Sequence, residues 1–292
     1  VSMGADPIRA IRMGTLNAAA YFGLHDMGAV APGYKADLAV FDDLRTLNVK
    51  QVYKGGKLVA ENGKMLHQKE KNTDWSTEIK ERVFHSFHRV PITVEELQLK
   101  ETTGTHQRVI DMVAHELITK ERIEEWKELP GVAPGVDISR DIVKLAAIER
   151  HKNTGHVGLG FLGKYGLKKG AVATSIGHDS HNLVIAGVTD EDMVLAGNRV
   201  IENGGGLAIA LEGKVLADLP LPIGGLMADE PVEVVDEKLE HMKKLSVELG
   251  ISEDIDAFMT LAFISLPVIP KLRLNTYGVV DVEKHQVVEA RF

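Results

Sequence analysis

The sequence predicts an α+β protein whose sheets are largely antiparallel. Short apolar runs at 36–41, 49–53 and 57–60 are separated by glycine-containing turns, a pattern typical of strands in tight hairpins. Between 171 and 219 the predicted order is strand, strand, helix, strand, strand, which indicates an α+β layer. A stretch at 235–250 places apolar residues on one face of a helix, which can pack on such a layer.

Composition limits the class of protein and its partners. The 292 residues suffice for roughly two domains, and 44% hydrophobic with 26% charged residues is typical of a soluble globular protein. A formal net charge of -8 argues against nucleic acid as a partner. The absence of cysteine excludes disulfides and thiolate ligands. No apolar run approaches the roughly 20 residues of a membrane span, and the start does not resemble a secretory signal, so we expect a cytoplasmic protein with no membrane partner.

The first predicted element is a helix that begins near residue 7. Asp6 can cap it, Pro7 suits its first turn, and Gly23 is a plausible end. Apolar residues follow at near-helical spacing, so we expect an apolar face that needs a partner. A polar stretch at 67–81 then indicates a linker or an exposed excursion.

Two later stretches, 109–126 and 141–151, alternate apolar and polar residues. This alternation favours half-buried antiparallel strands with polar outer faces, although 120–126 could equally be helical. A helix at 190–203 follows, with Thr189 or Asp190 as its cap and Gly204 at its end. After the helix at 235–250, the chain is predicted to end with a further helix, a proline-bounded loop and a short strand.

The stretch GHDSHN at 177–182 lies between two predicted buried strands and allows three interpretations. A metal site would need His178 and His181 to converge, whereas residues three apart on a strand point to opposite faces. A tight turn would use Asp179 and its polar neighbours to satisfy the backbone. An active-site loop would use the same side chains as hydrogen-bond donors and acceptors for a polar ligand.

Other polar motifs have simpler interpretations. Three glycines at 204–206 follow a helix rather than precede one, which favours a helix stop over a phosphate cradle. The stretch LPLPIGGLM at 219–227 indicates a rigid loop, with proximity to a substrate as the alternative. The remaining histidine pairs are expected in a polar turn (His151 and His156) and at surface or domain-interface positions (His85 and His88).

Two groups of motifs carry a resemblance to a known family. The stretches MGTLNAAAYFGLHDMGAVAPGYKADLAVFDDL and GGKLVAENGK resemble the end of an amidohydrolase-superfamily enzyme. The stretches GHDSHNLVIAGVTDEDM, NGGGLAI, LPLPIGGLMAD and FMTLAFISLPVIPKLRLNTYGVVDV resemble the extra C-terminal domain of bacterial adenine deaminases. The resemblance covers essentially the whole chain and implies three parts. These are a remnant last helix of a TIM-like barrel at 1–27, a β-sandwich portion at 28–80 and a C-terminal α+β domain at 81–292.

The resemblance implies hydrolytic deamination of adenine to hypoxanthine and ammonia by a metal-bridging hydroxide. In the intact enzyme the cofactor would be a divalent metal, namely manganese, iron or zinc, held by a His-x-His pair and further ligands of the barrel. No His-x-His occurs in this sequence. We therefore expect most of the barrel to be missing, no metal site on this chain, and no activity of the chain alone.

The resemblance also assigns candidate site residues and partners. Asp179 and His181 are the catalytic candidates, and His178, Ser180 and Asn182 are the substrate-binding candidates. The expected partners are adenine, the missing N-terminal barrel portion and further copies of the chain, because an uncovered apolar helix face favours oligomers. Two alternative functions stay open. One is a non-catalytic binding or assembly module, and the other is an amidohydrolase acting on another cyclic amide or amidine.

Overall fold

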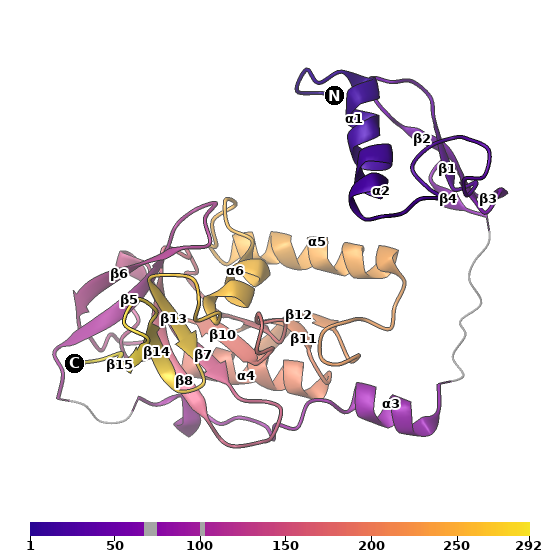
Figure 1. The fold of residues 1–292 in the computed structure, drawn as a ribbon. Helices are drawn as coiled ribbons and strands as arrows, with labels where there is room; N and C mark the ends of the chain where they lie inside the picture. The colour runs from indigo at the N-terminus through magenta and orange to yellow at the C-terminus, as the bar shows by residue number, and fades with distance from the viewer. Residues whose placement is uncertain (67–74, 100–102) are drawn as a thin grey trace. The chain divides into compact units, whose positions relative to one another are not determined.

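The computed structural model describes residues 1–66, 75–99 and 103–292, which form two compact units, Val1–Trp75 and Ser76–Phe292 (Figure 1). The proposed division after residue 80 falls within helix α3 (Thr77–Phe84), which belongs to the second unit. Most of the predicted polar linker, residues 67–74, lies outside the described residues. Within the described ranges, none of the helices has the length and apolar character needed to cross a membrane.

The first unit begins with three consecutive helical segments, α1 (Pro7–Arg12), the π-helical η1 (Met13–Asn17) and α2 (Ala18–Tyr21). The predicted cap is confirmed, because the Asp6 side chain accepts a hydrogen bond of 2.8 Å from the Arg9 backbone N–H. Gly23 adopts a φ of 67° just beyond the last helical residue. Several large apolar side chains on and after this helix are exposed, notably Ile8, Met13, Tyr21 and Phe22.

The rest of the first unit contains a four-stranded antiparallel sheet. Its strands follow each other in chain order: β1 (Leu38–Phe41), β2 (Val49–Lys54), β3 (Lys57–Glu61) and β4 (Lys64–Met65). Asp37 fixes the β2–β3 turn, since its carboxylate accepts hydrogen bonds from the Gly55 N–H and the Lys54 ammonium. The three hairpin strands predicted at 36–60 are therefore confirmed.

An eight-stranded mixed sheet is the centre of the second unit. Its spatial order is β12-β11-β9-β10-β7-β8-β5-β6, and all neighbours are antiparallel except β5 and β8. The described strands form an open sheet and no barrel. Their bounds are β5 (His106–Met112), β6 (Thr119–Glu125), β7 (Ile142–Ile148), β8 (Val157–Gly163), β9 (Ala171–Thr174), β10 (Leu183–Gly187), β11 (Gly206–Leu211) and β12 (Lys214–Pro220). The helical alternative for 120–126 is wrong, because these residues lie in or directly after β6.

Helices and a second small sheet cover the two faces of this sheet. Helix α4 (Asp190–Glu202) packs on β9, β10 and β11. Helix α6 (Ala257–Ile264) packs on β9 and β10, while α5 (Val232–Glu248) contacts β12. The small sheet contains β13 (Leu272–Asn275), β14 (Gly278–Asp281) and β15 (Gln286–Val288), and it packs on β7 and β8. The short 3-10 helices are η2 (Glu95–Leu97) and η3 (Ile138–Arg140).

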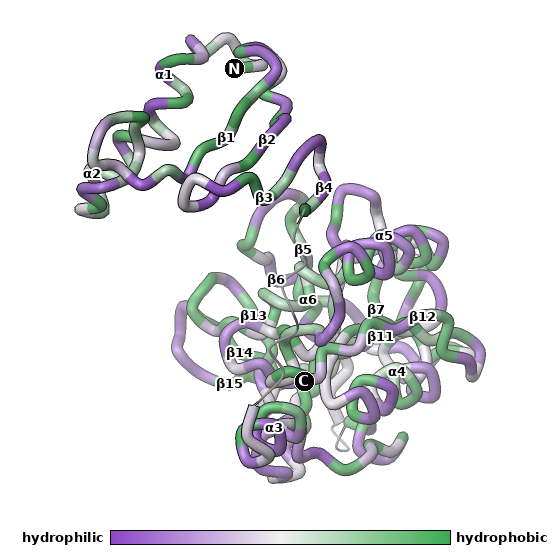
Figure 2. The backbone as a smooth tube through the Cα atoms, turned by 90° about the vertical axis from the view of Figure 1, so that its right-hand side faces the viewer, coloured by the Kyte–Doolittle hydropathy of each residue, from purple (hydrophilic) through white to green (hydrophobic). Residues whose placement is uncertain are grey.

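The prediction of a polar outer face is wrong for β7, because every residue of this strand is buried. Val143 and Leu145 belong to the core shared with α6 and β13, whereas Ala146 and Ile148 pack in the core beneath α4. The tube in Figure 2 shows the alternation of hydropathy along the segments of this unit. The charged Lys144 can be buried in this strand because its ammonium contacts the Asp190 carboxylate at 2.7 Å.

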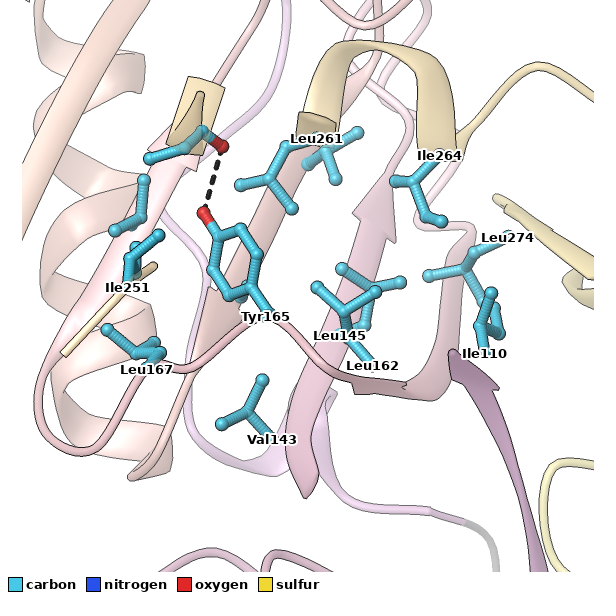
Figure 3. Packing of buried hydrophobic residues seen from close by; sticks show 14 of the residues in the cluster. Ile110, Val143, Leu145, Leu162, Tyr165, Leu167, Ile251, Leu261, Ile264 and Leu274 are labelled. Carbon is cyan, nitrogen blue, oxygen red and sulfur yellow. Dashed lines mark hydrogen bonds between the residues drawn. The ribbon is translucent and has the colours of Figure 1, made fainter. Parts of the chain in front are cut away.

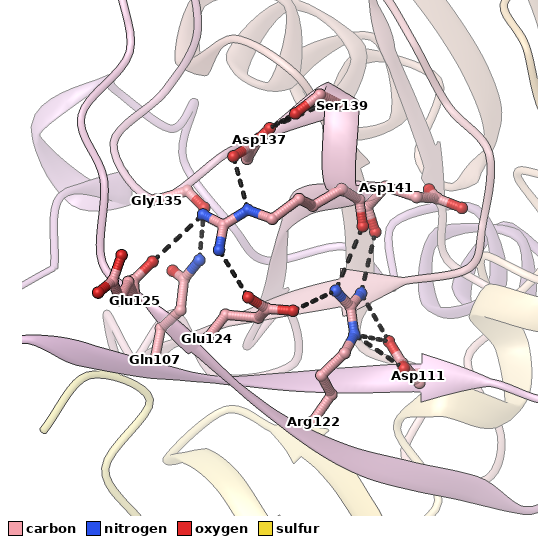
Figure 4. Close-up of polar contacts among 10 residues, drawn as sticks. Gln107, Asp111, Arg122, Glu124, Glu125, Gly135, Asp137, Ser139 and Asp141 are labelled. Atoms are coloured by element: carbon pink, nitrogen blue, oxygen red, sulfur yellow. Dashed lines mark hydrogen bonds and ion pairs between the residues drawn. The ribbon is translucent and has the colours of Figure 1, made fainter.

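Two groups of contacts fix the sheet to its neighbours. The buried Tyr165 hydroxyl donates a 2.8 Å hydrogen bond to the Ala257 carbonyl at the start of α6, amid apolar side chains such as Leu162 and Leu261 (Figure 3). On β5 and β6, Arg122 pairs with Asp111 at 2.9 Å, and Arg140 pairs with Glu124 at 2.6 Å. Glu124 also accepts from Arg122 (Figure 4). Since these carboxylates are already paired with guanidinium groups, we interpret this network as structural.

Candidate functional site

The GHDSHN motif forms the loop between β9 and β10, at one edge of the central sheet. Leu183 at the start of β10 pairs with Ile148 at the end of β7, and Thr174 at the end of β9 pairs with Leu207 at the start of β11. The segments after β7, before β11 and after β12 therefore gather at the same edge as this loop. We call residues 177–182 the edge loop.

The backbone of the edge loop folds back on itself. Residues 178–180 form a turn, the His181 N–H donates to the Gly177 carbonyl at 2.6 Å, and His181 adopts a φ of 50°. The two parts of the motif differ in solvent exposure. His178, Asp179 and Ser180 are exposed, while His181 and Asn182 are half-buried. All five candidate side chains therefore lie on one short loop, in two different environments.

Arg150 holds the inner side of the edge loop. Its Nε donates to the His181 carbonyl at 2.5 Å, and its two Nη atoms donate to the Gly224 carbonyl at 3.0 Å and the Ser86 carbonyl at 3.4 Å. The side chain is only 1% exposed, and no carboxylate among the described residues forms an ion pair with it. One guanidinium thus joins three segments through their carbonyl oxygens.

Two further residues complete the surroundings of Arg150. The Phe87 ring lies 4.9 Å from the guanidinium carbon, close enough for a cation–π contact. Gly225 packs so closely that a Cβ there would lie 2.7 Å from the Arg150 Nη1. The glycines at 224–225 are therefore explained by close approach to the buried guanidinium. Burial lowers the pKa of Arg150 to about 10, so the group stays charged at neutral pH.

Helix α6 contacts the outer part of the edge loop. The His178 N–H donates to the Ala262 carbonyl at 2.6 Å, and the Ser265 hydroxyl donates to the His178 carbonyl at 3.3 Å. The His178 ring lies edge-on to the Phe263 ring, with centroids 5.6 Å apart. His178 thus points toward α6, whereas the carbonyl of His181 faces Arg150. The two histidines are held by different elements.

The inner side of the loop presents two buried polar atoms that lack a hydrogen-bond partner among the described residues. They are the His181 Nδ1 and the Asn182 Oδ1. Burial, together with the nearby positive charge of Arg150, lowers the pKa of His181. A neutral imidazole can donate or accept at Nδ1, and the amide oxygen accepts, so the pair can serve a ligand that offers both an acceptor and a donor. Native proteins seldom leave such atoms without a partner.

A tight turn beside the edge loop depends on Glu149. Its carboxylate accepts hydrogen bonds from the backbone N–H groups of His151, Lys152 and Thr154 at 2.6, 2.8 and 2.9 Å. The His151 Nε2 in turn lies 2.7 Å from the Ser180 carbonyl, which connects this turn to the edge loop. The prediction that His151 and His156 flank a polar turn is therefore confirmed.

The Glu149 turn should make stability depend on pH. Burial opposes ionisation, but the hydrogen bonds from Thr154, Lys152 and His151 outweigh it and lower the pKa of Glu149 to about 2. Its contribution is fully present above the unfolded-state pKa and is lost as the pH falls toward 2. We expect Glu149→Gln to cost about 1–2 kcal/mol at pH 7 after solvent screening, and clearly less at pH 3, in urea unfolding. An equal cost at both pH values would contradict this account.

The other polar and glycine-rich motifs have structural or surface positions. The glycines at 204–206 end α4, with the Gly204 and Gly205 N–H groups donating to carbonyls of its last turns, so the predicted helix stop is confirmed. The Ser175 hydroxyl donates to the Gly225 carbonyl at 2.6 Å and accepts from the Gly206 N–H at 2.7 Å. His85 and His88 are exposed, in agreement with the predicted surface position.

The described residues do not fit a metal centre. Across 1–66, 75–99 and 103–292, no group of three or more His, Asp or Glu side chains is arranged to hold a metal ion. The edge loop illustrates this result, because His178 packs against Phe263 while His181 lies on the inner side. A metal-dependent reaction would need ligands other than the groups described.

Comparison with known proteins then assigns the family. Residues 116–286, which include the edge loop and Arg150, match the adenine deaminase C-terminal domain, and residues 1–59 match the amidohydrolase family. The chain belongs to the adenine deaminase C-terminal domain family. This membership confirms the family resemblance carried by GHDSHN and the later motifs.

Several curated members of the adenine deaminase family are similar over nearly the whole chain. Adenine deaminase 2 of Carboxydothermus hydrogenoformans is 45% identical over 99% of this chain and 49% of its own length. Adenine deaminases of Petrotoga mobilis and Lysinibacillus sphaericus are 42% and 40% identical, over 98% and 99% of this chain and 49% of their own lengths. The chain thus spans about half the length of the curated relatives it matches.

Proposed function

We propose that this chain acts as the C-terminal half of an adenine deaminase, in which the edge loop contributes polar groups to the adenine site. The observation that carries the proposal is the unpartnered pair formed by the His181 Nδ1 and the Asn182 Oδ1. A buried, carbonyl-bound Arg150 fixes the backbone beneath this pair, which is the preorganisation that a ligand site requires.

The chemistry of adenine suits these groups. The purine presents ring nitrogens that accept hydrogen bonds and one exocyclic amine that donates them. In the proposed complex the His181 imidazole donates to a ring nitrogen, and the Asn182 amide oxygen accepts from the exocyclic amine. The exposed Asp179 carboxylate is free to move a proton toward the departing ammonia, and His178 and Ser180 border the same position.

The metal of the proposed enzyme must come from other residues. The amidohydrolase family uses metals, and a bound metal ion would supply an activated water at neutral pH. Since the described residues of this chain offer no suitable ligand group, we assign them binding and proton transfer only.

A complementation assay tests this proposal. The purified chain is mixed with the remaining half of the Carboxydothermus relative, with manganese present, and ammonia release from adenine is measured. We expect no ammonia from the chain alone and adenine-dependent release from the mixture. A matched mixture containing only residues 76–292 of this chain asks whether the first unit is needed for assembly.

Two results would contradict the proposal. Metal-dependent ammonia release by the chain alone would show that it holds a complete catalytic site. A mixture that assembles, as judged by gel filtration, yet acts on another cyclic amide or amidine and not on adenine would assign the chain to a different reaction of the amidohydrolase family.

A further inference from the structure

A second polar site lies in a cavity of about 220 Å³ beside helix α6, and its lining includes Phe263, which also contacts His178 of the edge loop. One wall is formed by residues 112–117, which are the last residue of β5 and the connection toward β6, and another is the segment at 254–256 that leads into α6. Side chains from one face of α6 and Arg273 of β13 complete the lining. The proposed function uses none of the charged groups of this lining.

Arg273 forms the inner end of this cavity. Its side chain is only 1% exposed, and its strand β13 packs on β6, β7 and β8 of the central sheet. One Nη atom donates to the carbonyls of Leu117 and Pro270, while the Nε has no hydrogen-bond partner among the described residues. No carboxylate of the described chain forms an ion pair with this guanidinium. A buried charge without a counter-charge is costly.

Arg150 and Arg273 are equally buried but differ in how many hydrogen-bond partners their guanidinium groups have. Both guanidinium groups are 1% exposed, and burial lowers the pKa of each to about 10. Arg150 uses its Nε and both Nη atoms on carbonyl oxygens and lies against the Phe87 ring. Arg273 lacks a partner at Nε and lines a cavity instead. A carboxylate is the natural complement, since its two oxygens match the guanidinium fork.

The exposed part of the cavity carries more acidic than basic side chains. Glu116 and Asp254 line it and are exposed, and the 72% exposed Asp254 carboxylate lies 3.9 Å from the Nε2 of His115, which is also in the lining. Asp256 also lines it, but its carboxylate already caps α6 through the N–H groups of Phe258 and Met259. Elsewhere the walls are apolar, with Met259, Phe263 and Ile264 among them. The cavity therefore changes from positive inside through apolar to negative at its mouth.

We propose that this cavity binds a small zwitterion of the apolar α-amino acid class. The ligand carboxylate would pair with Arg273, its ammonium would face Asp254 and Glu116, and its apolar side chain would lie against α6. A dianion such as phosphate is disfavoured by the acidic mouth, and a simple amine is disfavoured by the inner guanidinium. This proposal is independent of the proposed deaminase function and of any catalytic activity.

The test uses the full chain and three probes of similar size. L-Leucine carries both charges, 4-methylpentanoate lacks the ammonium, and 3-methylbutylamine lacks the carboxylate. Methyl NMR of the methionines reports on Met112 and Met259, which line the cavity. Met193, a buried residue of α4 outside the lining, is the internal control. We expect saturable shifts of Met112 and Met259 with L-leucine at a Kd of about 1 mM, and about tenfold weaker binding of each single-charge probe.

Variants test whether the L-leucine shifts arise from binding in this cavity. Thr260→Phe fills the cavity from the partly exposed face of α6 and should abolish the L-leucine shifts. Arg273→Gln should weaken binding about tenfold or more, and Asp254→Asn should weaken it more than the neighbouring Glu253→Gln, which removes the same charge outside the lining. No saturable shift in the parent chain, or L-leucine shifts that persist in Thr260→Phe, would overturn the proposal.

Discussion

Replacing Arg150 with methionine should lower the free energy of unfolding of the second unit by about 2–4 kcal/mol. The reason is that methionine keeps most of the packing volume but leaves the carbonyls of His181, Gly224 and Ser86 without their donor. Urea unfolding followed by circular dichroism measures the change. The same variant should raise the pKa of His181 in an NMR titration, since the positive charge of Arg150 contributes to lowering it.

Two control variants test whether the loss of stability comes from the buried guanidinium of Arg150. Arg82→Met removes an exposed arginine of α3 and should change the unfolding free energy by less than about 0.5 kcal/mol. Arg150→Lys keeps the charge but not the planar fork, so it should recover only part of the loss. A cost below about 1 kcal/mol for Arg150→Met would show that the three carbonyls find other donors, and the edge loop would not depend on this anchor.

The second large effect is expected at Lys144. Its ammonium and the Asp190 carboxylate form a 2.7 Å ion pair with side chains only 1% and 6% exposed. Lys144→Met leaves this carboxylate buried without its cation, although Gln98 still donates to its other oxygen at 2.8 Å. We expect a loss of about 3–5 kcal/mol in unfolding free energy.

The double variant Lys144→Met/Asp190→Leu distinguishes the destabilisation caused by an unpaired buried charge from the net stabilisation that the ion pair provides. Replacing a buried ion pair by apolar groups of similar volume is often neutral, so the double variant should recover most of the stability lost in the single one. A double variant no more stable than Lys144→Met would contradict this account. That result would indicate that the packing of β7 against α4, rather than the uncompensated charge, determines the effect.

Much of the fold could be predicted from local patterns. Thr189 caps α4 as expected, Gly204 ends it, and the hairpin strands of the first unit lie where glycine-containing turns separate apolar runs. The polar outer face predicted for β7 was wrong for a reason that lies outside the strand. Lys144 appears polar in the sequence, but its partner Asp190 lies 46 residues away on α4. Period-two patterns cannot reveal such a pairing.

The candidate site could be predicted only in part. The GHDSHN motif was found from its unusual density of polar side chains, and it forms a turn at the end of two buried strands. Arg150, its main anchor, was missed because it contacts the loop 31 residues later and Ser86 64 residues earlier. A possible signal was the glycine pair at 224–225, which permits close backbone approach and packs on this guanidinium.

The most direct test of the edge loop is the kinetics of His181→Ala and Asp179→Asn in the complemented enzyme, with His85→Ala as an exposed histidine control. We predict that each loop variant lowers kcat for adenine by about 100-fold or more, the range of lost acid–base or positioning groups, with an unfolding free energy within about 1 kcal/mol of the parent. His85→Ala should leave both quantities unchanged. Unchanged kinetics in both loop variants would contradict the account and leave GHDSHN as a structural turn.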